Sequence, residues 1–208
     1  MKWTTDEIIQ WMDKTNEKIQ TNKQYLSSLD RAIGDGDHGI NMARGFKVVV
    51  EKIHDTSYAN ISQLIKDIAM TIIRHVGGAS GPLYGTAFLR FSLATKQAEV
   101  IDTSIFAKGM MAAVAGLKQR GRAMVGEKTL IDVWEPVTLY IQETGTIASN
   151  EIKRIAKEAM EKTKSLQATK GRAAYLKERS IGHVDPGAMS SYYIFLSLAE
   201  VLEGGGRG

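Results

Sequence analysis

The sequence predicts a single all-α domain. Apolar residues recur every three to four positions through most of the chain, which is the spacing of one face of an α-helix. The alternation typical of half-buried strands is nearly absent, and no Pro/Gly/Ser-rich linker divides the 208 residues. A chain of this length can bury one substantial core. We therefore expect one domain over residues 1–203, followed by a flexible Gly-rich tail over 204–208.

The apolar periodicity places eight helices along the chain. The first follows Thr4, which forms a capping-box pattern with Glu7 and precedes an apolar face that includes Trp11. Residues 62–76 carry an apolar stripe wide enough to face a core. Ser104 and Asn150 are suitable N-caps for two of the others. Besides these, helices are expected approximately over 40–53, 83–98, 103–120, 130–143, 150–169 and 187–203.

Composition excludes several classes of function. The chain has no cysteine, which rules out disulfides, thiolate nucleophiles and zinc–sulfur sites. The net charge is +4, but its bases alternate with acids, as in "EIKRIAKEAMEKTK", which is typical of a solvated helix face rather than a nucleic-acid-binding stripe. The N-terminus does not resemble a signal peptide, and no apolar run reaches the roughly 20 residues that span a bilayer. We expect a cytoplasmic protein with neither nucleic acid nor a membrane as partner.

Three connections contain Gly together with Asp, Ser or His: 30–39, 77–82 and 180–187. The first, "IGDGDHGIN", spells the Gly-x-Gly-x-x-Gly dinucleotide fingerprint, but the polar, helically spaced segment before it is not the apolar strand that this fingerprint requires. An EF-hand beginning at Asp30 fails because Ala32, Gly34 and Asn41 occupy ligand positions. "GRAMVGEKT" misses the P-loop pattern by one inserted residue and follows a helix.

Asp30, Asp35 and Asp37 remain as candidate metal ligands. The glycines between them allow a tight fold in which the three carboxylates converge. Converging carboxylates raise one another's pKa unless a cation lies among them, and hard oxygen ligands without Cys or His suit Mg²⁺. The aspartates would then face a phosphate across divalent cations. The alternative is that all three only cap helix ends and turns.

The other two connections fit the same ligand. "VGGASGPLYG" offers backbone N–H groups and the Ser80 hydroxyl before a helix, an arrangement that binds phosphate. "ERSIGHVDPGAMS" contains Arg179, which can pair with phosphate, and the Asp185–Gly187 turn. A Gly-Pro turn and an ordinary helix start are the structural alternatives for these two segments.

Four blocks in this order, "LDRAIGDGDHGINMARGF", "VGGASGPLYGT", "GEKTLIDVWEP" and "KGRAAYLKERSIGHVDPGA", resemble the L subunit of bacterial dihydroxyacetone kinase and the nucleotide-binding domain of the ATP-dependent enzymes. The resemblance covers the chain except its tail. It implies an eight-helix antiparallel barrel with a nucleotide in loops at one end. Asp30, Asp35 and Asp37 would hold two Mg²⁺ ions. The implied nucleotide contacts are His38, Gly39, Ile40, Asn41, Gly78, Ala79, Ser80, Gly121, Leu130, Arg179, Asp185, Pro186 and Gly187; Leu130 stands where a methionine is expected.

The resemblance also implies the reaction. A chain of this length has no room for a second, sugar-binding domain, so it resembles the stand-alone subunit of the phosphoenolpyruvate-dependent system. There, bound ADP is a coenzyme that is phosphorylated by a phosphohistidine of the M subunit and passes the phosphate to dihydroxyacetone on the K subunit. No covalent nucleophile is expected on this chain, since phosphoryl transfer depends on positioning and charge neutralisation. A homodimer is compatible with the sequence.

Other functions stay open at this point. The chain is also compatible with a regulatory nucleotide-binding subunit that docks to a transcription factor, or with an ATP-dependent kinase subunit for another short sugar. A phosphohistidine carrier using His38 or His183 is a further alternative, which the resemblance disfavours.

Overall fold

The computed structural model describes residues 2–96, 98 and 100–205. Within this part, nine α-helices, two short 3-10 segments and a pair of two-residue strands follow one another. In chain order they are β1 (Lys2–Trp3), α1 (Thr5–Thr21), α2 (Lys23–Ile33), α3 (His38–His54), α4 (Ile61–His75), α5 (Ser80–Thr95), β2 (Ile101–Asp102), α6 (Thr103–Gly121), α7 (Ile131–Thr144), α8 (Ser149–Lys162), η1 (Thr163–Ser165), η2 (Arg172–Ser180) and α9 (Pro186–Gly205).

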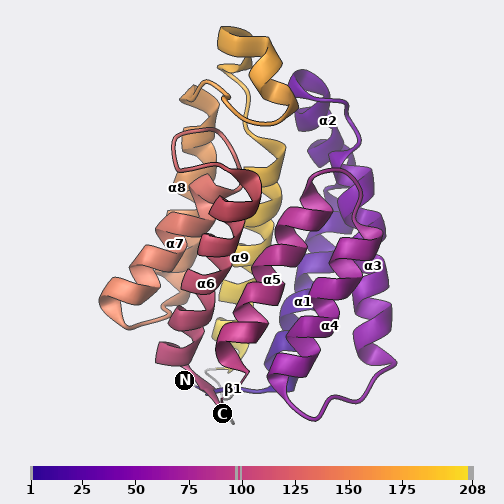
Figure 1. Cartoon of the computed structure of the whole chain (residues 1–208), viewed down its shortest axis with the longest axis vertical. Coiled ribbons are helices and arrows are strands. Elements are labelled where there is room, and N and C mark those ends of the chain that lie inside the picture. The colour runs from indigo at the N-terminus through magenta and orange to yellow at the C-terminus, as the bar shows by residue number, and fades with distance from the viewer. Residues whose placement is uncertain (1, 97, 99, 206–208) are drawn as a thin grey trace.

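Eight of these helices form a closed antiparallel ring. Each of α1, α3, α4, α5, α6, α7, α8 and α9 packs on the next, and α9 returns to α1. Successive members of the ring run in opposite directions along its long axis (Figure 1). The predicted eight-helix antiparallel barrel is therefore confirmed. Helix α2 is not a member of the ring; it contacts α3, α9 and η2 at the upper end in Figure 1.

The two ends of the ring differ. Both termini lie at the lower end in Figure 1, where β1 pairs antiparallel with β2 and Trp3 is opposite Ile101. Trp3 stacks on Phe106 with ring centroids 4.9 Å apart, so the pairing covers this end of the core. The connections α2–α3, α4–α5, α6–α7 and α8–α9 all lie at the upper end. The alternating helix direction thus gathers three of the Gly-containing segments at one end.

Aromatic residues fill the interior of the ring. Trp134 contacts Phe195 with centroids 5.0 Å apart and Phe88 at 6.1 Å, and Trp11 contacts Phe88 at 5.8 Å. These residues come from α1, α5, α7 and α9, so side chains from opposite sides of the ring meet at its centre. Such large, fully buried rings contribute much of the apolar area removed from water. No helix among the described residues is long and apolar enough to cross a lipid bilayer.

Several predicted boundaries are wrong. The structure adds α2, which Asn22 separates from α1, and it ends α8 at Lys162, although a helix was predicted to 169. The capping box at Thr4 is confirmed, because the Glu7 carboxylate accepts a hydrogen bond from the Thr4 N–H at 2.6 Å. Asp102, not Ser104, caps α6, and α8 begins at Ser149. Gly204 and Gly205 continue α9; residue 97 of the predicted helix 83–98 and residues 206–208 of the predicted tail lie outside the described residues.

We predict that Gly85→Ala destabilises the ring. A Cβ at Gly85 would lie 2.2 Å from Ile73 Cγ1 and 3.0 Å from the Ala69 carbonyl oxygen, so α4 and α5 could not pack as closely. Overpacking of this kind costs about 1–3 kcal/mol, more than the roughly 1 kcal/mol that Ala gains over Gly inside a helix. The control is Gly204→Ala in α9, where a Cβ meets nothing within 4 Å. Thermal unfolding measures both variants; a melting temperature for Gly85→Ala at or above wild type would contradict the packing.

Candidate functional site

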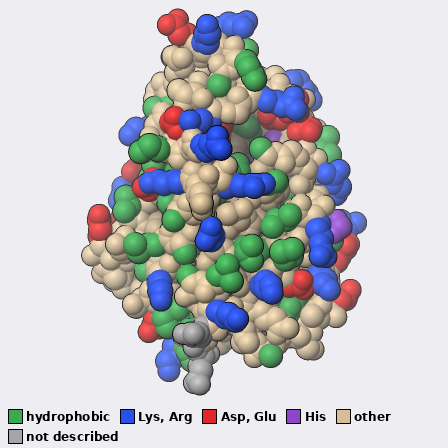
Figure 2. Space-filling model, viewed as in Figure 1, with side chains coloured by type: hydrophobic (Ala, Val, Ile, Leu, Met, Phe, Trp, Pro, Cys, Tyr) green, Lys and Arg blue, Asp and Glu red, His purple; other side chains and the backbone are tan. Residues whose placement is uncertain are grey.

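A cavity of about 590 Å³ opens at the end of the ring where the α2–α3, α4–α5, α6–α7 and α8–α9 connections meet. Figure 2 shows the hollow in the upper part of this face, bordered by both basic and acidic side chains. Its volume is in the range of small-molecule sites. The residues that line it are Asp30, Ile33, Gly34, Asp35, Asp37, His38, Asn41, Gly77, Gly78, Ala79, Ser80, Pro82, Leu83, Arg120, Gly121, Ala123, Lys128, Thr129, Leu130, Ile131, Lys170, Gly171, Arg172, Ala173, Asp185, Pro186 and Gly187.

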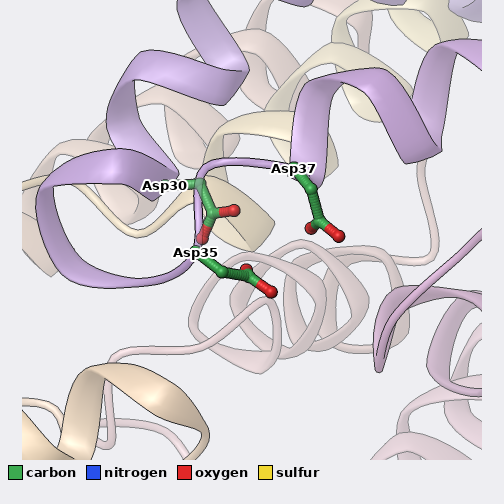
Figure 3. A group of neighbouring side chains, drawn as sticks. All are labelled: Asp30, Asp35 and Asp37. Carbon is green, nitrogen blue, oxygen red and sulfur yellow. The ribbon is translucent and has the colours of Figure 1, made fainter.

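Three carboxylates converge on one side of the cavity (Figure 3). Asp30 lies in the last turn of α2, Asp35 in the α2–α3 connection and Asp37 at the N-cap of α3. One oxygen of each lies within 4.8 Å of one oxygen of the others. The backbone makes this convergence feasible at Gly34, where a Cβ would lie 2.2 Å from Asp30 Oδ1. The three aspartates therefore converge as predicted.

The electrostatics of this cluster favour a cation. Burial raises the pKa of the Asp30 carboxyl, and the charges of Asp35 and Asp37 raise it further, although the His38 N–H donates to Asp30 Oδ2 at 3.0 Å. The only ion pair to the cluster among the described residues is that of Asp35 Oδ2 with Arg172 Nη2, at 3.0 Å. Three convergent carboxylates with a single basic partner retain net negative charge. Their hard oxygen atoms fit Mg²⁺.

His38 joins the carboxylate side of the cavity to the N-terminus of α5. Its Nε2 lies 2.9 Å from Ser190 Oγ and its Nδ1 lies 3.2 Å from Ser80 Oγ. Burial lowers the pKa of the imidazole to about 4, so the ring is neutral at neutral pH. Both ring nitrogens are hydrogen-bonded to hydroxyls. This arrangement supports a role in orienting Ser80 and leaves His38 no free ring nitrogen with which to carry phosphate.

The α4–α5 connection forms the second polar wall. Gly78 has φ +65°, and at Gly77 a Cβ would lie 2.4 Å from Asn41 Oδ1, so this backbone passes directly over Asn41. Helix α5 begins at Ser80, and no side chain in the described residues caps its N-terminus. Free N–H groups and the positive end of the helix dipole therefore face the cavity, as in phosphate-binding helix termini. The wall is opposite in charge to the carboxylate cluster.

The remaining wall is apolar. Leu83, Gly121, Ala123, Leu130 and Ile131 line it, from α5, α6, the α6–α7 connection and the start of α7. Leu130 is buried and packs near Gly187, where a Cβ would lie 3.5 Å from Leu130 Cβ. These residues offer an apolar surface to a ligand in the cavity.

A hydroxyl network fixes the floor of the cavity. The Tyr84 hydroxyl donates to the Gly187 carbonyl oxygen at 2.9 Å and lies 2.7 Å and 2.8 Å from the hydroxyls of Ser190 and Ser191. Trp134 Nε1 donates to Ser191 Oγ at 3.0 Å. Helices α5, α7 and α9 are thereby joined by polar contacts directly below the Asp185–Gly187 turn.

Most of the predicted contact residues line the cavity, but three do not. Gly39 packs α3 on α2, since a Cβ there would lie 2.0 Å from the Lys23 carbonyl oxygen. Ile40 is 53% exposed and Arg179 lies exposed on η2, both outside the cavity lining. Arg172 and Lys170, which the sequence did not single out, are basic residues of the same segment that do line the cavity. Their only signal was the "KGRAAY" part of the fourth block of the resemblance.

The fold and the cavity define an all-helical barrel whose open end combines a carboxylate cluster, a glycine-bordered helix N-terminus and an apolar wall. Residues 32–200 match the DAK2 domain. Over 199 residues the chain is 46% identical to the PTS-dependent dihydroxyacetone kinase, ADP-binding subunit DhaL, of Lactococcus lactis, covering 96% of this chain and 98% of the relative. It is 39% identical over 205 residues to the corresponding PEP-dependent subunit of Escherichia coli, with the same coverage. The chain therefore belongs to the DAK2-domain family, among relatives named as ADP-binding subunits of dihydroxyacetone kinases.

Solved structures share the fold. The native dihydroxyacetone kinase of C. freundii superposes with a TM-score of 0.77 at 21% identity, covering 95% of this chain and 35% of that one. The same kinase in complex with AMP-PNP and Mg²⁺ gives a TM-score of 0.77, covering 96% of this chain and 34% of that one. This chain thus corresponds in fold to about a third of the larger kinase.

We predict that Asp185 makes stability depend on pH. Burial and the nearby Asp132 raise the pKa of Asp185 to about 7, against 3.8 for the ordinary group, although the Ala188 N–H and Lys128 oppose the shift. Because the folded pKa lies above the unfolded one, this group's contribution to stability is complete below about pH 4 and is lost as the pH rises through about 7. Denaturant unfolding of the ligand-free protein from pH 4 to 8 measures the slope. Asp185→Asn should lack this component; an unchanged slope would contradict it.

Proposed function

We propose that this chain is the ADP-binding subunit of a phosphoenolpyruvate-dependent dihydroxyacetone kinase. ADP, held with two Mg²⁺ ions, is the coenzyme that takes phosphate from a phosphohistidine of the M subunit and delivers it to dihydroxyacetone on the K subunit. The product is dihydroxyacetone phosphate, and the location is the cytoplasm, where phosphoenolpyruvate is available. The names of the relatives in Lactococcus lactis and Escherichia coli support the nucleotide, the phosphate source and the need for further subunits.

One observation carries the proposal: the three-aspartate cluster and the uncapped N-terminus of α5 lie in a single cavity. Neither feature binds a bare ligand well, because the carboxylates repel phosphate and the helix terminus repels metal ions. A phosphate chain with bound Mg²⁺ satisfies both, since its cations contact carboxylates and its oxygens contact N–H groups. The complex with AMP-PNP and Mg²⁺ formed by the C. freundii kinase supports this ligand.

The charges nearly balance. Three carboxylates and a diphosphate carry roughly six negative charges, against four from two Mg²⁺ ions. Arg172 and Arg120 line the same cavity and supply the remaining positive charge, whereas Lys170 in the same lining is paired with Glu127. Mg²⁺ neutralises the charge on the transferring phosphoryl group, which is the main requirement of phosphoryl transfer. The protein's own contribution is to hold Asp30, Asp35 and Asp37 in place.

The other residues position the ligand and exclude water. Neutral His38 orients the Ser80 hydroxyl, and the N–H groups of the first turn of α5 face the phosphates. Leu83 and Leu130 offer the apolar wall on which an adenine ring fits. The cavity opens to solvent on one side, so a phosphate chain bound there is within reach of a docked partner subunit.

We predict that the nucleotide is recycled rather than exchanged. Protein loaded with labelled ADP and freed of excess nucleotide, then mixed with the M and K subunits, phosphoenolpyruvate and its phosphocarriers, should make dihydroxyacetone phosphate over many turnovers. Label should stay on the protein even with excess unlabelled ADP, because cations and N–H groups hold it at several points. Label lost on each turnover, or rapid sugar phosphorylation by this chain with free ATP alone, would contradict the coenzyme role. In the latter case, an ATP-dependent kinase subunit would be the better description.

We predict that Asp37→Asn weakens both Mg²⁺ and ADP binding. Removing one carboxylate lowers the affinity for the divalent cation by roughly tenfold or more, and ADP then faces the two remaining carboxylates with less compensation. Calorimetric titration with ADP at several Mg²⁺ concentrations measures the coupling.

Asp55→Asn is the control. Asp55 is an exposed aspartate at the opposite end of α3, and its replacement by Asn makes the same change in charge. It should bind ADP as the wild type does. Equal ADP affinity for Asp37→Asn and wild type, with and without a chelator, would show that the carboxylates do not bridge to nucleotide through metal.

A further inference from the structure

Lys128 is a fully buried lysine in the connection between α6 and α7, with 1% of its surface exposed. Within the described residues, its ammonium donates hydrogen bonds to three backbone carbonyl oxygens: Thr163 at 2.6 Å, Leu166 at 3.2 Å and His183. An ammonium has three N–H donors, so this set uses all of them. Although Lys128 lies in the cavity lining, it has no donor left for a phosphate.

The three carbonyls belong to the two ends of residues 163–183, which make up most of the α8–α9 connection. Two further contacts tie the same ends: the Gly182 N–H donates to the Lys164 carbonyl at 2.8 Å and the Asp185 N–H to Thr163 Oγ1 at 3.1 Å. Between these ends lie Lys170, Gly171 and Arg172, which line the cavity, and Arg172 pairs there with Asp35. Lys128 therefore joins the α6–α7 connection to the base of the segment that carries these basic residues.

The environment of Lys128 is specific for this contact. Its backbone is left-handed, with φ +60°, a conformation that a residue other than Gly adopts when its surroundings enforce it. The Asp132 carboxylate fixes the α6–α7 connection, because it accepts hydrogen bonds from the N–H groups of Gly126 at 2.6 Å and Thr129 at 2.7 Å. Burial lowers the pKa of the Lys128 ammonium, whereas the charges of Asp185 and Asp132 raise it. The net shift is downward, so Asp185 and Asp132 offset only part of the cost of burial, and the three carbonyls are the direct partners of the ammonium.

We propose that Lys128 is a positioning residue: by binding three carbonyls of the α8–α9 segment, it holds Lys170 and Arg172 over the cavity and thereby slows release of the bound nucleotide. The effect on the segment follows from the geometry alone. The effect on the nucleotide rests on the proposed function.

The test uses the full chain with Lys128→Met, which keeps the length of the side chain but removes the ammonium. The control is Lys164→Met, an exposed lysine in the same region. Hydrogen exchange of residues 163–183 without nucleotide should be at least tenfold faster in Lys128→Met than in wild type or the control. Mg-ADP should dissociate at least tenfold faster from Lys128→Met. Binding of Mn²⁺ alone should not weaken, because Asp30, Asp35 and Asp37 lie on other elements and the Arg172–Asp35 ion pair competes with a cation for Asp35.

A second variant separates the ammonium from a general loss of packing. In Lys128→Ala, added propylammonium can occupy the vacated space and donate to the same three carbonyls, whereas propanol cannot replace the charge. Propylammonium should restore slow exchange of residues 163–183 and slow ADP release; equal effects of propylammonium and propanol would overturn the proposal. If neither variant folds, Lys128→Arg is measured in the same way; its planar guanidinium spreads its donors, so the segment should still exchange faster than in wild type.

The remaining outcomes are also decisive. A loosened segment with unchanged ADP release would refute the positioning role, and faster ADP release with an unchanged segment would mean that Lys128 contacts the nucleotide directly. Failure of the wild-type protein to bind ADP would refute the proposed function, while the exchange measurement would still test whether Lys128 holds the segment.

Discussion

Three like charges held within 4.8 Å of one another are the constraint on which the open end of this protein depends. Asp30 is largely buried, and both burial and its neighbours oppose its ionisation. Arg172 compensates one carboxylate through a solvent-exposed ion pair, a type of contact that contributes little stability. The cluster therefore retains uncompensated negative charge, which favours the binding of divalent cations. The surrounding structure provides the other ligands that such cations would share, namely phosphate oxygens held at the N-terminus of α5.

The topology of the helical ring brings the other residues of the cavity to the same end as this cluster. Because successive helices alternate in direction, every second connection lies at the same end, and segments more than 100 residues apart in the chain meet around one cavity. The aromatic core and the Tyr84 network keep α5, α7 and α9 in fixed relation below it. This rigidity favours binding of a polyanion, because side chains that are already ordered in the free protein lose little conformational entropy when the ligand binds.

The sequence predicted those parts of the structure that depend on local spacing. The eight ring helices follow from apolar periodicity, and the convergence of Asp30, Asp35 and Asp37 follows from the glycines between them. Metal coordination by these aspartates, and nucleotide contacts by the residues named with them, stay predictions. Helix α2 was not among the eight predicted helices, although its segment was seen to be polar and helically spaced; only four of its eleven residues are buried, so its apolar stripe is short.

The parts that sequence reasoning missed depend on the tertiary path of the chain. Arg172 reaches Asp35 across more than 130 residues of sequence, and only the fold of segment 163–185 brings it there. Lys128 resembled the lysine of a phosphate-binding loop, yet its left-handed backbone directs the ammonium to three carbonyls. Neither a left-handed lysine nor a buried ammonium has a local sequence signature. Both residues lie within the sequence blocks that resemble the family, but the resemblance does not say what either side chain contacts.

The central claim is that cations held by the three aspartates connect the protein to the nucleotide phosphates. A crystal structure of the protein with ADP and Mn²⁺, analysed by the anomalous scattering of manganese, tests it most directly. Manganese is expected within coordination distance of Asp30, Asp35 and Asp37 and, at the same time, of the ADP phosphate oxygens. Manganese bound to phosphate alone, with the carboxylates turned away or paired with Arg172, would contradict the account.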